Sequence, residues 1–312
     1  MPAANAEILK KDNMKYFFLP LLCIGLIKSA HAEPYAEVRK NIAYNNADPE
    51  NVIDLYYPQT GEGPYPTHIM IHGGGWVKGT KELGGLEGEL FLKLSEQGFL
   101  GVSVEYRKVD KARNQYMRTS TVDALDAVRY VVAHAEELNV DPKQIFVWGG
   151  SAGGHLALMA ATAIDNPELS DIPELASVSV KIRGALAWFP PCDMENYEAI
   201  SVEKNGKLRL LSDRMGCTLE DNRAAYQEIS PLYNLSSDCP PILIFHGDAD
   251  NVVNMEHSIR FKKKTDQQGV DCTLQIVHNA GHGFSRQPEQ SPSADDIINA
   301  SSDFFSGLAA QK

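Results

Sequence analysis

A serine flanked by glycines is the first feature of the sequence that could do chemistry. Residues 148–154 read WGGSAGG and contain the pattern G-x-S-x-G. When this pattern joins a strand to a helix, the chain turns sharply and leaves the serine hydroxyl exposed at the strand end. Gly149 and Gly153 have no Cβ, so the neighbouring backbone can approach the turn. Ser151 is therefore a candidate nucleophile, but so short a pattern also recurs by chance and needs support from elsewhere in the chain.

A serine hydroxyl needs a neighbouring base, and His282 is the candidate. Residues 278–284 read HNAGHGF, follow an apolar run and place His282 between two glycines. We expect the His282 ring to accept the Ser151 proton when the hydroxyl attacks a carbonyl carbon. His278 belongs to the end of the preceding strand and is interpreted as a packed or surface histidine.

A carboxylate must orient such a histidine, and two aspartates follow another apolar run. Residues 242–250 read ILIFHGDAD. Asp250 is preferred over Asp248 because it lies further past the strand end, where the turn can bring it toward Ser151. Either aspartate could instead cap the turn, a common role of aspartate after glycine. The prediction is that Asp250 holds the His282 ring in the right tautomer.

A run of glycines upstream could bind the negative charge that develops on a carbonyl oxygen. Residues 72–76 read HGGGW and directly follow an apolar strand. Loops of this type supply backbone amides to an oxyanion hole, and glycine leaves no side chain between those amides and the substrate. We expect the amides of Gly74, Gly75 and Ala152 to form this hole. The alternative interpretation is a flexible glycine turn.

The elements that must position these residues alternate between strand and helix. Two strands at 37–43 and 52–57 are expected to open the fold in antiparallel fashion. Strands then alternate with helices as far as the C-terminus, which predicts a mostly parallel sheet covered by helices on both faces. The expected strands are 68–72, 100–106, 145–148, 183–188, 241–246 and 272–278, and the expected helices are 86–97, 120–139, 152–164, 255–268 and 294–308.

Two local features of this pattern carry further expectations. Ser120 and Asp123 are positioned to form a capping box at the start of the helix that ends near Asn139. Residues 190–232 lack a clear element, and a connection of that length is usually functional or forms a small cap over a site. We therefore expect residues 190–232 to shape specificity.

The motifs HGGGW, GGSAGG, HGDAD and AGHGF together resemble the carboxylesterase branch of the α/β-hydrolases. This branch includes hormone-sensitive-lipase-like enzymes and the bacterial acetyl xylan and feruloyl esterases, and the resemblance covers residues 52–284. It implies an α/β-hydrolase fold in one catalytic domain, 33–312, that hydrolyses carboxylic esters through an acyl-enzyme without cofactor or metal. The chain order Ser151, Asp250, His282 is the order of that superfamily. Smaller matches at 105–107, Asp123 and 229–232 are interpreted as structural.

One departure from the lipase-like relatives bears on substrate. Those relatives carry a longer N-terminal cap, whereas here only a short, strand-like stretch precedes HGGGW. The site is therefore expected to be open, as in esterases that remove acetyl or feruloyl groups from plant polysaccharides, so a small-molecule or polysaccharide-linked ester is the expected partner. The same residues could cleave amides, as a peptidase or formamidase does. A binding module on the same fold is the remaining alternative.

Composition and the N-terminus limit the cellular setting. The 312 residues carry a net charge of −12, and 262–264 is the only run of three lysines, which argues against a nucleic-acid partner. Lys15, an apolar run at 16–27 and Ala30-His31-Ala32 are typical of a secretory signal peptide within 1–32. That run is too short to cross a bilayer, which takes about 20 residues, so we expect export to a periplasm or the medium without stable membrane insertion. Met14 is an alternative start.

Four cysteines follow this segment, an even number in a chain expected to reach an oxidising compartment. Disulfides are therefore expected, and the favoured pairs are Cys192 with Cys217 and Cys239 with Cys272. Free buried thiols are the alternative. A metal site is disfavoured because the sequence has no CxxC or closely spaced Cys/His pattern.

Overall fold

The computed structural model describes residues 34–198 and 211–311, and Pro34–Lys312 forms one compact unit. The predicted signal segment at 1–32 lies outside the described residues. Within the part that is described, no helix combines the length and the apolar character that a membrane span needs.

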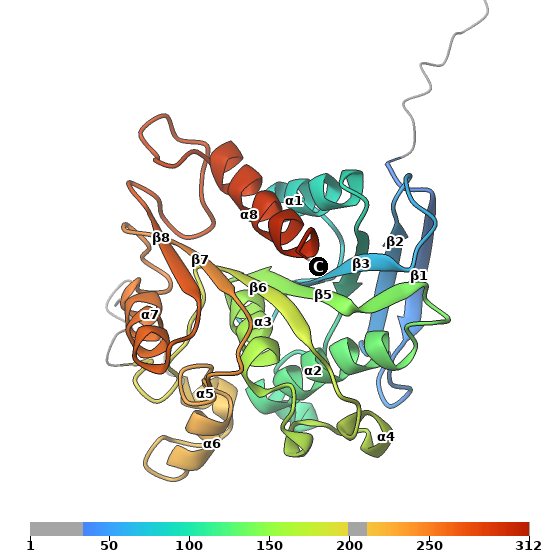
Figure 1. Cartoon of the computed structure of the whole chain (residues 1–312). Helices are drawn as coiled ribbons and strands as arrows, with labels where there is room; N and C mark the ends of the chain where they lie inside the picture. The colour runs from blue at the N-terminus through green and yellow to red at the C-terminus, as the bar shows by residue number, and fades with distance from the viewer. Residues whose placement is uncertain (1–33, 199–210, 312) are drawn as a thin grey trace, which may run out of the picture. The chain divides into compact units, whose positions relative to one another are not determined.

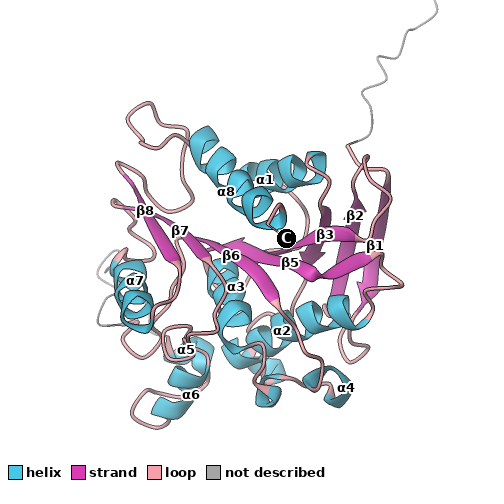
Figure 2. Cartoon of the chain, in the orientation of Figure 1, coloured by secondary structure: helices cyan, strands magenta, loops and turns pink. Residues whose placement is uncertain are grey.

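An eight-stranded sheet runs through this unit in the order β1-β2-β4-β3-β5-β6-β7-β8 (Figures 1 and 2). β2 is antiparallel to both β1 and β4, and every pair from β4 to β8 is parallel. This confirms the predicted antiparallel opening and parallel continuation. The strands are β1 Glu37–Ala43, β2 Val52–Tyr57, β3 Tyr65–Ile71, β4 Leu100–Val104, β5 Val140–Gly150, β6 Ile182–Trp188, β7 Ile242–Gly247 and β8 Cys272–Val277.

Helices cover both faces of the sheet, as the alternating pattern predicts. α1 and α8 pack together on one face, whereas α2, α3 and α7 cover the other (Figure 1). The long helices are α1 Gly85–Glu96, α2 Met117–Ala133, α3 Ala152–Ala163, α7 Glu256–Gln268 and α8 Ala294–Ala309. The short ones are α4 Pro173–Ala176, α5 Ser212–Met215, α6 Arg223–Glu228 and the 3-10 turns Lys111–Arg113 and Pro167–Leu169.

The side chains of the central strand β5 point alternately to the two faces of the sheet, which explains why there is a hydrophobic core on each face. Successive strand side chains point to opposite faces. In β5, Ile145 and Val147 enter the core beneath α2 and α3, whereas Phe146 and Trp148 enter the core beneath α1 and α8. All four side chains are fully buried. The end of β5, where Ser151 follows, is therefore held from both sides.

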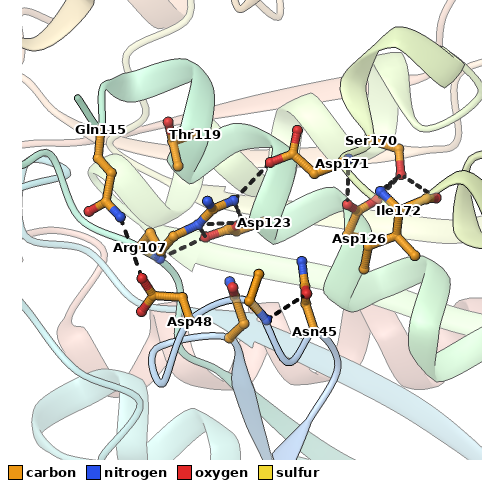
Figure 3. A network of polar contacts seen from close by, with 12 residues as sticks. Asn45, Asp48, Arg107, Gln115, Thr119, Asp123, Asp126, Ser170, Asp171 and Ile172 are labelled. Atoms are coloured by element: carbon orange, nitrogen blue, oxygen red, sulfur yellow. Dashed lines mark hydrogen bonds and ion pairs between the residues drawn. The ribbon is translucent and has the colours of Figure 1, made fainter. Parts of the chain in front are cut away.

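The start of α2 differs from the prediction. The helix begins at Met117, and the Thr119 hydroxyl accepts a hydrogen bond from the Tyr116 amide at 3.3 Å. Ser120 and Asp123 do not form the predicted capping box, because both are bound to Arg107. The Ser120 hydroxyl donates to the Arg107 carbonyl oxygen. The Asp123 carboxylate accepts from the Arg107 guanidinium in a bidentate pair (Figure 3). The predicted helix end at 139 was also too late, since α2 stops at Ala133.

Arg107 links the segment after β4 to α2. Its Nη2 atom lies 2.6 Å from Asp123 Oδ1 and 2.9 Å from Asp171 Oδ2. Asp126, one turn along the same helix, accepts from the Ser170 hydroxyl and the Asp171 amide (Figure 3). These contacts support the structural interpretation of the smaller motif matches around 105–107 and Asp123.

All four cysteines in the described residues are free thiols, so the predicted disulfides are wrong. Three of the sulfurs contact groups two or three residues away in the chain. Cys192 is buried with Sγ 3.5 Å from the Pro190 carbonyl oxygen, and Cys217 is partly exposed with Sγ 4.0 Å from the Met215 carbonyl oxygen. Cys239 Sγ accepts from the Ser236 amide at 3.4 Å. Sequence proximity to one connecting region or to paired strands did not bring the sulfurs together.

Candidate active site

Ser151 lies at a strained turn between β5 and α3. Its φ of 57° and ψ of −120° place a non-glycine residue outside the common conformations, as in a nucleophile elbow. The Ser151 amide is fixed by donating to the Trp188 carbonyl oxygen at 2.8 Å. The close packing of the turn on β3 also requires glycine, since a Cβ on Gly153 would lie 1.9 Å from the Ile71 carbonyl oxygen. The fold therefore fixes the position of the serine hydroxyl.

His282 lies on the loop after β8 and reaches both Ser151 and Asp250. Its Nε2 atom is 3.0 Å from Ser151 Oγ, and its Nδ1 atom is 2.7 Å from Asp250 Oδ2. The Phe189 ring packs against the imidazole with a centroid distance of 4.5 Å. The structure thus brings together the three side chains that the sequence singled out, in one hydrogen-bonded chain.

Asp250, in the turn after β7, is a buried carboxylate with several donors. Its Oδ1 atom accepts from the amides of Val252 and Val253 at 2.8 and 3.0 Å, while Oδ2 faces His282. Burial alone raises the pKa of Asp250, but the hydrogen bonds from His246 and His282 outweigh burial and hold that pKa well below its usual range. Asp250 is therefore ionised at neutral pH and can stabilise a positively charged His282 ring.

In the described structure, Asp248 and His278 contact each other and do not contact Ser151 or His282. Asp248 accepts from His278 Nδ1 at 3.0 Å and from the Asn279 amide at 2.8 Å, so it joins the turn after β7 to the end of β8. His278 is largely exposed. The preference for Asp250 over Asp248 thus agrees with the geometry.

His246 is a site residue that the sequence reasoning did not assign. It is fully buried at the end of β7, with Nδ1 2.7 Å from Ser258 Oγ and Nε2 3.0 Å from the Val253 carbonyl oxygen. The same Nε2 lies 3.5 Å from Asp250 Oδ2. His246 therefore braces the Asp250 turn, and its place four residues before Asp250 in HGDAD was the available signal.

The glycine loop after β3 lies beside Ser151. Gly73 and Gly74 line the cavity next to the serine, and Gly75 is outside that lining. Gly74 has a φ of +121°, and a Cβ there would lie 1.9 Å from the Lys78 carbonyl oxygen. Among the described residues, the amides of Gly74 and Gly75 donate to no backbone acceptor. Ala152 is the first residue of α3, where helix geometry also leaves the amide without a partner.

His72 anchors this loop through both ring nitrogens. Nδ1 is 2.7 Å from the Gly73 carbonyl oxygen, and Nε2 is 3.1 Å from Glu105 Oε1. Burial raises the pKa of Glu105, but hydrogen bonds from His72 and Lys108 lower it to about 2. The Tyr106 hydroxyl donates to the His72 carbonyl oxygen at 2.9 Å, and its ring stacks on the imidazole. Glu105 and Tyr106, the small motif after β4, therefore hold the glycine loop in place.

The cavity beside Ser151 has a volume of about 340 Å³. Half of its lining positions are glycines, so backbone forms much of the wall. None of the described residues in the predicted specificity region, 190–232, lines it, although Arg214 Nε donates to the Gly75 carbonyl oxygen at 3.0 Å. The lining residues are His72, Gly73, Gly74, Gly79, Thr80, Gly84, Gly85, Leu86, Glu87, Gly150, Ser151, Trp188, Phe189 and Gly283.

Two family models match the chain. The BD-FAE model matches residues 53–265, and the dienelactone hydrolase family model matches residues 226–307. Among curated proteins, the isoprenylcysteine alpha-carbonyl methylesterase ICME of Arabidopsis thaliana is 26% identical over 84% of this chain and 60% of that protein. The chain therefore spans less than two thirds of the length of this relative.

Solved structures share the fold over most of the chain. A truncated carbohydrate esterase from gut microbiota superposes with a TM-score of 0.74 at 24% identity, covering 89% of this chain and 98% of that one. Esterase Est2 of Thermogutta terrifontis, solved with propionate bound, gives a TM-score of 0.70 at 25% identity, covering 89% and 97%. With an α/β-hydrolase sheet and a BD-FAE match over more than half of its length, the chain belongs to the BD-FAE family of α/β-hydrolases.

Proposed function

We propose that this chain is a serine esterase that hydrolyses carboxylic esters through an acyl-enzyme. The observation that carries the proposal is the hydrogen-bonded chain from Asp250 through His282 to Ser151, with distances of 2.7 and 3.0 Å. A serine, a histidine and an ionised aspartate in this order are the groups that acyl transfer requires.

Ser151 Oγ attacks the ester carbonyl carbon while His282 Nε2 takes the hydroxyl proton. Asp250 keeps the proton of His282 on Nδ1 and stabilises the positive ring. The tetrahedral intermediate then collapses, the bond to the alcohol oxygen breaks, and His282 returns the proton to the leaving alcohol. Water attacks the acyl-enzyme by the same route, which releases the carboxylic acid and restores Ser151.

The oxyanion of this intermediate is assigned to the amides of Gly74, Gly75 and Ala152. The open hydrogen-bonding capacity of the glycine amides and the position of Ala152 at the start of α3 support the assignment. The helix N-terminus adds a partial positive charge near the same point.

The proposed substrates are esters of short acyl groups, or acetyl or feruloyl esters carried on a polysaccharide. The small cavity volume supports a short acyl group. Est2, 25% identical to this chain, binds propionate, which is in keeping with that size. The polysaccharide part of the proposal depends on the resemblance of the motifs to acetyl xylan and feruloyl esterases.

Export is proposed as well, from the signal-like pattern at residues 15–32. A C-terminally tagged chain should be recovered outside the cytoplasm, with Glu33 as its first residue on N-terminal sequencing. Recovery of the uncleaved chain in the cytoplasm alone would contradict this proposal.

Hydrolysis of 4-nitrophenyl acetate, butyrate and octanoate tests the activity, with Ser151→Ala in parallel. We expect turnover to fall with acyl length and to be lost in the variant. Acetylated and feruloylated xylan are the next substrates. If wild type and Ser151→Ala are equally inactive on all three esters, the esterase proposal is wrong, and peptide or formamide substrates should then be examined.

A further inference from the structure

Glu87 carries a carboxyl group that lies in the cavity beside Ser151. The mechanism proposed for the triad of Ser151, His282 and Asp250 does not use this group. Glu87 lies in the first turn of α1 and lines the same cavity as Ser151. Its position depends on the residue just before the nucleophile, because a Cβ on Gly150 would lie 2.5 Å from Glu87 Oε1. Gly150 has no positive φ that would itself call for glycine. The missing side chain at 150 therefore makes room for the Glu87 carboxyl group.

Several buried or partly buried carboxylates among the described residues have a cationic partner, whereas Glu87 has none. Asp54 pairs with Lys81, Glu105 with Lys108 and Asp123 with Arg107. Glu87 forms no ion pair with any residue in ranges 34–198 and 211–311. A carboxylate offers about four acceptor positions, of which the Gly150 amide fills one, and leaving the others unused in a partly enclosed site costs free energy. A bound substrate is therefore the natural source of the missing donor.

The chemistry of the wall favours a neutral donor such as a hydroxyl group. Apart from Glu87, the cavity offers glycine backbone, the hydroxyl groups of Thr80 and Ser151 and the His72 ring. Its apolar side chains are Leu86, Trp188 and Phe189. Burial raises the pKa of Glu87, and this effect exceeds the opposite effects of His72, the Gly150 amide and His282. A hydroxyl group can accept from a protonated carboxyl and donate to an ionised one, so it fits either form.

We propose that Glu87 is a specificity-determining residue that hydrogen-bonds a hydroxyl group of the bound ester. The inference rests on the proposed esterase activity and narrows its substrates to hydroxylated esters, such as monoacylated polyols and sugars. The hydroxyl belongs either to the alcohol or to the acyl part of the ester, because the cavity adjoins Ser151 from the glycine loop to Phe189.

Three ethyl-sized esters separate these two sources. Ethyl acetate carries no hydroxyl, 2-hydroxyethyl acetate carries one on the alcohol, and ethyl glycolate carries one on the acyl group. Acid release in a pH-stat gives kcat/KM for each ester with wild type, Glu87→Gln, Glu87→Ala and Ser151→Ala. Glu96→Gln is the matched control, because Glu96 is an exposed carboxylate at the other end of α1.

Wild type should prefer one hydroxylated ester over ethyl acetate by roughly 10- to 100-fold, the range expected for a hydrogen bond to a charged group. Glu87→Ala should abolish the preference, and Glu87→Gln should keep part of it because the amide oxygen still accepts. Any loss of ethyl acetate turnover in the Glu87 variants should be smaller than the loss on the preferred ester, and Glu96→Gln should behave as wild type. Thermal unfolding of each variant checks that the fold is retained.

Two results would overturn the proposal, and they are distinguishable. Ser151-dependent turnover with no preference for either hydroxylated ester, or an equal loss on all three esters in the Glu87 variants, removes the role of Glu87 alone. No Ser151-dependent turnover of any of the three esters or of 4-nitrophenyl acetate removes the esterase proposal and the role of Glu87 with it.

Discussion

Asp250 can be changed to asparagine without altering its shape, and the structure indicates how the amide would be oriented. Oδ1 of Asp250 faces the donating amides of Val252 and Val253. The asparagine oxygen must keep that position, so its NH₂ group takes the place of Oδ2, 2.7 Å from His282 Nδ1. An NH₂ group is a donor, and Nδ1 must then become the acceptor.

This reorientation removes the base. With Nδ1 accepting, the imidazole proton moves to Nε2, which faces Ser151 Oγ at 3.0 Å and can no longer take its proton. The corresponding aspartate-to-asparagine change in serine proteases lowers kcat by about 10⁴-fold, or roughly 5 kcal/mol. We expect a loss of that order in kcat for Asp250→Asn on 4-nitrophenyl acetate, with little change in KM because the substrate-binding wall is untouched.

Asp248→Asn is the matched control. Asp248 ties His278 and Asn279 to the turn but contacts no triad residue in the described structure. Its kcat should stay within a few-fold of wild type. A loss of less than about 10-fold in Asp250→Asn, or an equal loss in Asp248→Asn, would refute the reasoning from amide orientation.

Three further outcomes are expected. Lowering the pKa of Glu105 from 4.5 to about 2 corresponds to roughly 3 kcal/mol of stability, which is complete above pH 4.5 and lost as the pH falls toward 2. The free energies of unfolding of wild type and Glu105→Gln in urea should therefore converge over this window. Gly74→Ala, whose methyl would meet the Lys78 carbonyl oxygen, should lower kcat about 10²- to 10³-fold while the fold is retained. Dithiothreitol should leave the unfolding temperature unchanged, and alkylation should label all four cysteines of the unfolded protein after residue 33.

The fold and the grouping of Ser151, Asp250 and His282 could be predicted from the sequence for the same physical reason. Ser151, Asp250 and His282 each follow a short apolar strand and stand among glycines. In a parallel sheet such strand ends meet at one edge, so three local patterns are enough to bring distant residues together. The continuous burial of residues 145–150 at the end of β5 likewise agrees with their apolar residue types.

Other features could not be predicted because they depend on packing between distant segments. Ser120 and Asp123 fit a capping box by spacing, yet Arg107, which follows β4, binds both and leaves the helix start to Thr119. The cysteine pairs were inferred from neighbouring segments, but a disulfide also requires close sulfurs with a specific geometry. The contact of His246 with Asp250 likewise depends on the turn after β7, which places the two side chains 3.5 Å apart.

The glycines around Ser151 are required for two different reasons, close approach of backbone and close approach of a side chain. Gly149 and Gly153 are needed because the elbow packs on the Ile71 carbonyl oxygen, which a Cβ would approach to 2.3 and 1.9 Å. Any serine hydrolase with this elbow faces that constraint, whatever its substrate. Gly150 differs, because the atom nearest to a Cβ there is the end of the Glu87 side chain rather than backbone, so Glu87 would have to move. Gly149 and Gly153 are therefore required by the turn at Ser151, whereas Gly150 leaves room for Glu87, the residue proposed to determine specificity.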